Sequence, residues 1–255
     1  MAEGGSLTIA VLVKQVPDMN AIRIDRARGT IVPSPQNVMS SYDQYAVEAA
    51  LCLKESLGGE VVAVTAGPPS ARDVVTRALT MGADRGIHLE LPDVNATDTL
   101  GMARVLASAL APLACDLVIA GQTSDDLETG QVGAQVAQLL GLPVISNVVE
   151  IQLDGRDLTV RRDMEDGYQT VRTSLPALLL SSTGLDEPRV PSLKGIMAAK
   201  KKPIEAAPVS AEEPRLAWSA PVVPEKTVTG TIVQDLPPAE AARQLVAWLQ
   251  EQKLI

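Results

Sequence analysis

Short apolar runs alternate with amphipathic segments along the first 145 residues of the chain. Residues 7–13 (LTIAVLV), 60–66 (EVVAVTA) and 116–120 (DLVIA) are apolar almost throughout, which is typical of parallel strands covered on both faces. Between them, residues 43–55 place apolar side chains at helical spacing, and two glycines follow. The alternation predicts an α/β fold, Rossmann-like in its right-handed βαβ units and open parallel sheet. Further helices are expected over 67–81, 97–114 and 129–140, and further strands over 86–90 and 144–145.

The pattern changes after residue 147. Residues 148–153, 158–162 and 169–173 are short β-prone segments, and Asp154-Gly155 between the first two is a hairpin signal. We therefore expect an antiparallel extension of the sheet. An apolar strand over 176–182 and a short helix over 193–199 then complete an α/β domain that spans residues 1–203.

The last 52 residues, 204–255, are expected to form an extended arm and a terminal helix. Residues 203–238 are rich in proline and alanine with little periodicity, so they bury too little apolar surface to order themselves. Residues 239–249 are amphipathic, with apolar side chains on one side. Either the arm packs on a partner subunit or it folds back on its own domain.

Composition and charge exclude several classes of function. Only 2% of the residues are aromatic and none is Phe, which predicts an aliphatic core. With 22 basic and 31 acidic residues the net charge is −9, so nucleic acid is not an expected partner. A single histidine, His88, argues against a Ser-His-Asp relay and against a zinc site of several imidazoles, and no metal site is expected. Cys52 and Cys115 form no CxxC pair, and no apolar run is long enough to span a membrane, so a cytoplasmic location is expected.

Candidate binding chemistry follows three of the predicted strands, at residues 14–18, 66–68 and 121–131. In a parallel sheet these strand ends converge on one crevice. Gly67 and Gly121 let a ligand approach the backbone, and the turn at 129–131 starts a helix whose free N–H groups suit a phosphate. An adenine nucleotide is therefore the expected ligand. Asp125, Asp126 and Glu128 would repel its phosphate, so we expect them to face solvent, ribose or the adenine amino group. Each signal taken alone is better explained as an ordinary turn or helix cap. Neither GxGxxG nor a P-loop occurs at these positions.

Several longer motifs are more specific. Residues 13–18 (VKQVPD), 129–133 (TGQVG), 185–189 (LDEPR) and 196–202 (IMAAKKK), with 45–50 (YAVEAA) and 78–84 (ALTMGAD), together resemble the β subunit of electron transfer flavoproteins. The resemblance covers residues 7 to 203. It implies an adenine nucleotide α-hydrolase-like fold and a subunit that performs no bond-making step, so no catalytic residue is expected.

The resemblance also implies partners and ligands. An α subunit would carry FAD, dehydrogenases would donate electrons, and a quinone reductase or another acceptor would receive them. Residues 16–19 would lie toward the flavin. Leu185 would be the protruding apolar anchor of a partner-recognition loop shaped by Glu187, Pro188 and Arg189. The crevice would hold AMP as a structural nucleotide, with the contacts Leu12, Ser40, Ser41, Tyr42, Asp43, Ala66, Gly121, Gln122, Thr123, Ser124, Asp125, Asp126, Leu127, Glu128, Thr129, Gly130, Gln131 and Val132.

Two departures from the family pattern leave alternatives open. Position 40 is Ser where the family usually has Asn, and residues 126–133 (DLETGQVG) resemble the loop of the nitrogen-fixation-associated and electron-bifurcating branch. That branch often binds a second FAD where others bind AMP, although Leu127 replaces its glycine. A second FAD would make the protein part of a bifurcating enzyme that oxidises NADH. A free-standing adenine-nucleotide sensor or hydrolase is the third alternative.

Overall fold

The computed structural model describes residues 6–25, 28–94, 97–219, 221–224, 230 and 232–255. The chain divides into two units, Met1–Pro221 and Val222–Ile255. The first unit contains the sheet and the helices that cover it, and the described part of the second contains a helix. Residues 220, 225–229 and 231 of the predicted arm lie outside the described residues.

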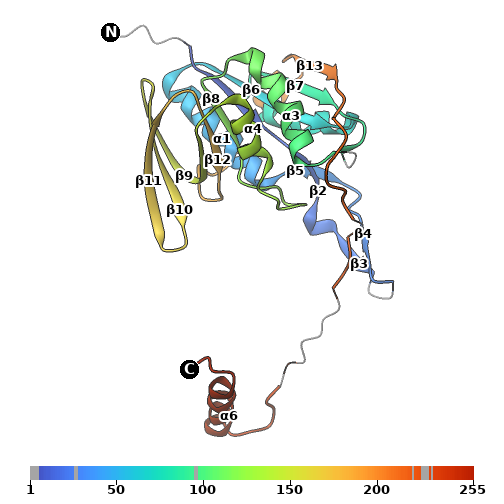
Figure 1. Cartoon of the computed structure of the whole chain (residues 1–255), viewed down its shortest axis with the longest axis vertical. Coiled ribbons are helices and arrows are strands. Elements are labelled where there is room, and N and C mark those ends of the chain that lie inside the picture. Colours follow the sequence, from blue (N-terminus) through green and yellow to red (C-terminus); the bar gives the residue numbers. More distant parts are fainter. Residues whose placement is uncertain (1–5, 26–27, 95–96, 220, 225–229, 231) are drawn as a thin grey trace. The chain divides into compact units, whose positions relative to one another are not determined.

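A nine-stranded sheet forms the centre of the first unit, with the strand order β11-β10-β9-β12-β8-β1-β6-β7-β13 (Figure 1). All neighbouring pairs from β9 through β12 to β13 are parallel, whereas β9, β10 and β11 pair antiparallel. This arrangement confirms the predicted open parallel sheet with an antiparallel extension. The strands are β1 (Thr8–Leu12), β6 (Glu60–Gly67), β7 (Arg85–Glu90), β8 (Leu117–Gly121), β9 (Val144–Asp154), β10 (Asp157–Met164), β11 (Gly167–Ser174), β12 (Ala177–Ser181) and β13 (Ile204–Pro208).

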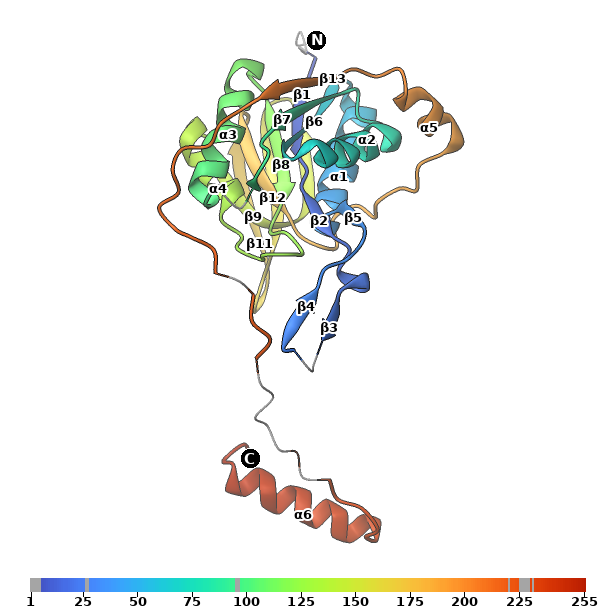
Figure 2. The ribbon, with the colours of Figure 1, turned by 90° about the vertical axis from the view of Figure 1, so that its right-hand side faces the viewer.

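Helices cover both faces of the sheet (Figure 2). One core cluster lies under α1 (Ser41–Leu57) and α2 (Arg72–Met81), and the other lies under α3 (Thr99–Leu110) and α4 (Val132–Leu140). The short helix α5 (Leu193–Ala199) packs against α2. In the described ranges every buried hydrophobic side chain is aliphatic or methionine, as the composition predicted. Short 3₁₀ turns occur at Met19–Ala21, Pro69–Ala71 and Ala111–Leu113.

Five strands were not expected from the sequence. Four of them form two small antiparallel pairs between β1 and α1: β2 (Gln15–Pro17) with β5 (Asn37–Met39), and β3 (Arg23–Asp25) with β4 (Thr30–Val32). The fifth, β13, extends the sheet in parallel with β7, beyond the boundary at residue 203 that the sequence suggested. All five strands are short, and apart from β2 their residues are mostly exposed, so they lack the apolar run that marks a buried strand.

The single histidine contacts backbone carbonyl groups, and the two cysteines are not bonded to each other. The buried His88 ring lies on β7, with Nε2 at 3.1 Å from the carbonyl oxygen of Gly67 and 3.2 Å from that of Pro68. Cys52 and Cys115 are both free thiols. His88 therefore supports the turn after β6.

The second unit contains α6 (Pro238–Glu251), which matches the predicted terminal helix. Leu245, Val246 and Trp248 of this helix are all exposed within the described residues. No helix in the described ranges is both long enough and apolar enough to cross a membrane.

Candidate functional site

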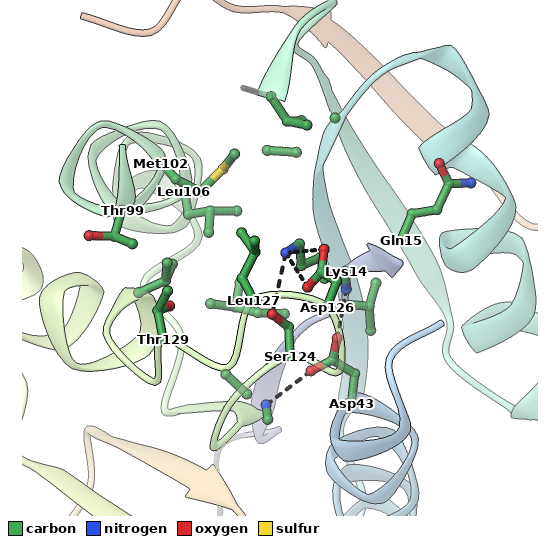
Figure 3. Close-up of a pocket in the computed structure, with 18 of the residues that line it drawn as sticks. Lys14, Gln15, Asp43, Thr99, Met102, Leu106, Ser124, Asp126, Leu127 and Thr129 are labelled. Atoms are coloured by element: carbon green, nitrogen blue, oxygen red, sulfur yellow. Dashed lines mark hydrogen bonds and ion pairs between the residues drawn. The ribbon is translucent and has the colours of Figure 1, made fainter. Parts of the chain in front are cut away.

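The carboxyl ends of β1, β6 and β8 meet at a cavity of about 440 Å³ (Figure 3). Its apolar wall comes from these strands and from α3, and includes Leu12, Val64, Ala120, Met102 and Leu106. The loop after β8 forms the polar side. The three predicted strand ends therefore do converge on one crevice, as a parallel sheet requires.

Most of the predicted nucleotide contacts line this cavity, and five do not. Ser40 and Tyr42 are absent from the lining, and Ser41, Asp125 and Glu128 line a neighbouring hollow. Asp125 accepts hydrogen bonds from the backbone N–H and the hydroxyl of Ser41, each at 2.7 Å. Asp125 thus ties the β8 loop to the start of α1. The predicted residues that line the cavity are Leu12, Asp43, Ala66, Gly121, Gln122, Thr123, Ser124, Asp126, Leu127, Thr129, Gly130, Gln131 and Val132.

Lys14 places a positive charge in the cavity. Its Nζ lies 2.7 and 2.8 Å from the two carboxylate oxygens of Asp126 and 3.3 Å from the hydroxyl of Ser124. Among the described residues that line the cavity, no other is Lys or Arg. The sequence suggested that Asp126 faces solvent, a ribose or the adenine amino group. In the structure Asp126 instead forms an ion pair with Lys14, the side chain that would attract an anionic ligand.

Asp43 joins two of the strand ends. Its carboxylate accepts a hydrogen bond from the backbone N–H of Lys14 at 2.7 Å and another from that of Gly121 at 3.2 Å. Burial raises the pKa of Asp43 to about 7, and the N–H groups of Lys14 and Gly121 lower it by less. Asp43 thus fixes the backbone on both sides of the cavity.

The raised pKa of Asp43 predicts a pH dependence of stability. The folded chain keeps a proton on Asp43 between its ordinary pKa of 3.8 and about 7, where the unfolded chain has lost it. The contribution of Asp43 to stability is therefore greatest below this range and declines as the pH rises through it. Asp43→Asn cannot ionise, so its free energy of unfolding should improve relative to wild type from pH 5 to pH 7 and then level off. Urea unfolding at several pH values measures this difference.

Asp98→Asn is the matched control for that series. Backbone N–H donors, that of Gly101 first, hold the pKa of Asp98 below its ordinary value. Asp98 is therefore ionised in both states above pH 5, and its variant should differ from wild type by a constant amount. If the difference in unfolding free energy between Asp43→Asn and wild type were also constant with pH, the raised pKa of Asp43 would be contradicted.

The loop after β8 is closely packed at Gly121 and offers donors for a phosphate. Gly121 packs so tightly that a Cβ there would lie 2.5 Å from Asp43 Oδ1. Thr123 lines the cavity, and its buried hydroxyl has no hydrogen-bond partner among the described residues. Helix α4 begins at Val132 and has no side-chain cap, so its first N–H groups are free for an anion. An orphaned hydroxyl, a lysine and a free helix N-terminus fit the phosphate end of a nucleotide.

The proposed partner-recognition loop differs from expectation at its anchor. Leu185 is only 7% exposed and belongs to the main core cluster, so it does not protrude. Arg189 binds the buried carboxylate of Glu48 and the exposed carboxylate of Glu55 on α1. Leu185 and Arg189 thus fasten the loop to the domain, while Glu187 is exposed and Pro188 half-buried.

Several lining residues were missed or appeared only within a motif. Lys14 lies in the strand-end segment 14–18 that the sequence indicated, but it was not among the expected nucleotide contacts. Thr99 and Met102 come from the first turns of α3, which follows β7, and the end of β7 was not among the three strand ends expected at the crevice. Trp218 comes from the arm, and nothing in its local sequence indicates that it lines the cavity.

Comparisons with known proteins identify the class. The model of the electron transfer flavoprotein domain matches residues 29–212, so the chain belongs to that family. The chain is 33% identical to the electron transfer flavoprotein subunit beta of Clostridium acetobutylicum, over 98% of this chain and 100% of that protein. It is 36% identical to the subunit beta of Syntrophomonas wolfei, over 96% of each chain. The caffeyl-CoA reductase-Etf complex subunit CarD of Acetobacterium woodii is 38% identical, over 78% of this chain and 77% of that protein. Within the family, the chain is a β subunit.

Proposed function

We propose that this β subunit holds AMP in the cavity at the strand ends and pairs with an α subunit that carries FAD. The pair would take electrons from dehydrogenases and deliver them to a quinone reductase or another acceptor. The observation that carries the proposal is the two-sided cavity, aliphatic on the sheet and α3 side and donor-rich on the loop side. FAD on the α subunit would supply the redox chemistry.

Different parts of the cavity would bind the phosphate and the adenine. Lys14 and the free N–H groups at the start of α4 hold the phosphate, and the aliphatic wall accommodates the adenine. Lys14 exchanges all or part of its contact with Asp126 for the phosphate. None of these groups needs to react, so the nucleotide acts as a structural element that links β1, β8 and α4.

A second FAD in the same cavity is the alternative, and one feature of the cavity favours it. The lining continues beyond Lys14 to Gln15, Pro17 and Asn37, on β2 and β5. FAD contains an AMP moiety and extends beyond it, so this extension offers a path for the flavin half. A bound second flavin would give this subunit a part in NADH oxidation. Family membership favours either form of electron transfer over a free-standing nucleotide sensor or hydrolase.

Nucleotide analysis of the purified complex tests the proposal. The chain is co-expressed with its α subunit, and the bound nucleotides are released by acid and identified by chromatography. We expect one FAD and one AMP per heterodimer. Two FAD and no AMP would replace the proposal by the bifurcating alternative. A stable, flavin-free chain that binds no α subunit would overturn both.

Contact with partner proteins is proposed for two exposed surfaces. Near the recognition loop, Val190 and Leu193 are apolar side chains left exposed, at 87% and 79% exposure. The apolar side chains of α6 form the second surface, which we assign to the α subunit. Both assignments follow from large apolar side chains left exposed.

A further inference from the structure

A segment of the arm runs from the far edge of the sheet to the cavity. After β13, residues 209–219 pass α3 on the way to the carboxyl ends of the strands (Figure 2). Val209 and Ala211 pack against the core cluster under α3, and Arg104 of α3 forms an ion pair with Glu212. We call residues 209–219 the strap.

The strap is fastened to the same turn that borders the cavity. Oδ2 of Asp98 accepts hydrogen bonds from the backbone N–H groups of Arg215 at 2.8 Å and Leu216 at 3.3 Å. The indole Nε1 of Trp218 donates to the carbonyl oxygen of Thr97 at 3.3 Å. Thr97 and Asp98 both line the cavity. A movement of the strap would therefore displace groups that contact the cavity wall.

Trp218 gives the cavity an aromatic surface on which a ring can stack. The chain contains only two Trp and three Tyr, and no Phe. Within the described residues Trp218 is the one aromatic side chain that lines the cavity, and it is half-exposed. Aromatic side chains stack on heterocyclic bases, and an alanine substitution typically removes about tenfold or more of the affinity.

We propose that the strap closes the cavity over the bound nucleotide and that Trp218 stacks on its planar heterocycle. The inference rests on the proposed nucleotide site and adds a specificity-determining residue to it. The heterocycle is the adenine of AMP or a ring of FAD, and the two ligands are tested separately. Release of the nucleotide then requires the strap to open.

Tryptophan fluorescence of the full-length chain tests the contact. In Trp248→Phe all tryptophan emission comes from Trp218, so saturating AMP should change the emission strongly. In Trp218→Phe the remaining tryptophan is Trp248, which is not among the described residues that line the cavity, so AMP should leave its emission unchanged. Trp218→Ala should bind AMP and FAD about tenfold more weakly in equilibrium dialysis, whereas Trp248→Phe should bind both as wild type does.

Asp98→Ser tests the fastening. The serine hydroxyl can still accept the hydrogen bond of the Gly101 N–H, which Asp98 Oδ1 accepts at 2.8 Å, so the cap of α3 is retained. The second oxygen, which holds the strap, is lost. Stopped-flow displacement should show faster AMP release from Asp98→Ser than from Glu212→Gln, because Asp98 lines the cavity and Glu212 is not among its described lining residues.

The outcomes separate the strap from the nucleotide site. Wild type that binds AMP or FAD, with weaker binding and faster release in the strap variants, supports the inference. The role of the strap is overturned if wild type binds the nucleotide, Trp218→Ala binds it equally well, and AMP leaves the emission of Trp248→Phe unchanged. The proposed nucleotide site would then still stand. Wild type that binds neither AMP nor FAD overturns the proposed site and the strap with it.

Discussion

Replacement of Arg189 by methionine is expected to lower the free energy of unfolding by about 2–4 kcal/mol. The guanidinium lies 2.8 Å from Glu48 Oε1, and the backbone N–H of Arg189 donates to the other oxygen of that carboxylate at 3.0 Å. The side chain of Glu48 is only 6% exposed, so the substitution leaves a buried charge without its partner. The expected loss of stability is smaller than for a fully buried ion pair, because a third of the Arg189 side chain is exposed to solvent.

Urea unfolding of matched variants measures this effect. Arg161→Met breaks an exposed ion pair with Glu150 and should cost less than about 1 kcal/mol. Adding Glu48→Leu to Arg189→Met removes the uncompensated charge, so the double variant should recover part of the loss. Equal stabilities for Arg189→Met and Arg161→Met would show that the Arg189 network does not hold the loop to α1.

The central sheet could be predicted because its strands are buried on both faces. The apolar runs at residues 7–13 and 60–66 leave little choice except parallel strands, and these form β1 and β6. Strand β13 could not be found in this way, since its five residues are mostly exposed and it is held by backbone pairing with β7. Backbone pairing leaves no hydrophobic pattern in the sequence.

The position of the cavity was predictable, but its internal contacts were not. Parallel strands bring their ends together whatever side chains follow, so the loop at 121–131 was found. The ion pair of Lys14 with Asp126 joins residues 112 positions apart, and no local pattern encodes it. The Trp218 contact likewise depends on the path of the arm.

The motif at 185–189 identified a family feature without showing which side chains are exposed. Leu185 looks like an anchor in a motif read alone. In the structure the chain turns there so that Leu185 enters the core, while Arg189 reaches Glu48 on a helix 141 positions earlier. Burial depends on these long-range contacts, which is why the sequence could not decide between an exposed and a buried leucine.

Replacement of Gly121 by alanine is expected to weaken AMP binding roughly 100-fold. The added Cβ would lie 2.5 Å from Asp43 Oδ1, 2.7 Å from Tyr42 Cβ and 3.1 Å from the carbonyl oxygen of Thr123. Asp43 must then move, which frees the backbone N–H groups of Lys14 and Gly121 and shifts both the β1 end and the β8 loop. The β1 end and the β8 loop then each lose their position toward the ligand. A loss of about 1.4 kcal/mol of binding free energy at each of the two corresponds to a factor of roughly 100 in affinity.

Equilibrium dialysis with AMP on the full-length chain, at a temperature well below unfolding, measures the loss. The same substitution at Gly230 is the control, because a Cβ there meets no atom within 4 Å, and it should leave AMP binding unchanged. Overpacking should also lower the free energy of unfolding of Gly121→Ala by about 1–3 kcal/mol. Wild-type affinity in a variant with that lower stability would mean that the strand ends can shift without disturbing the ligand, and that Asp43 does not shape the nucleotide site.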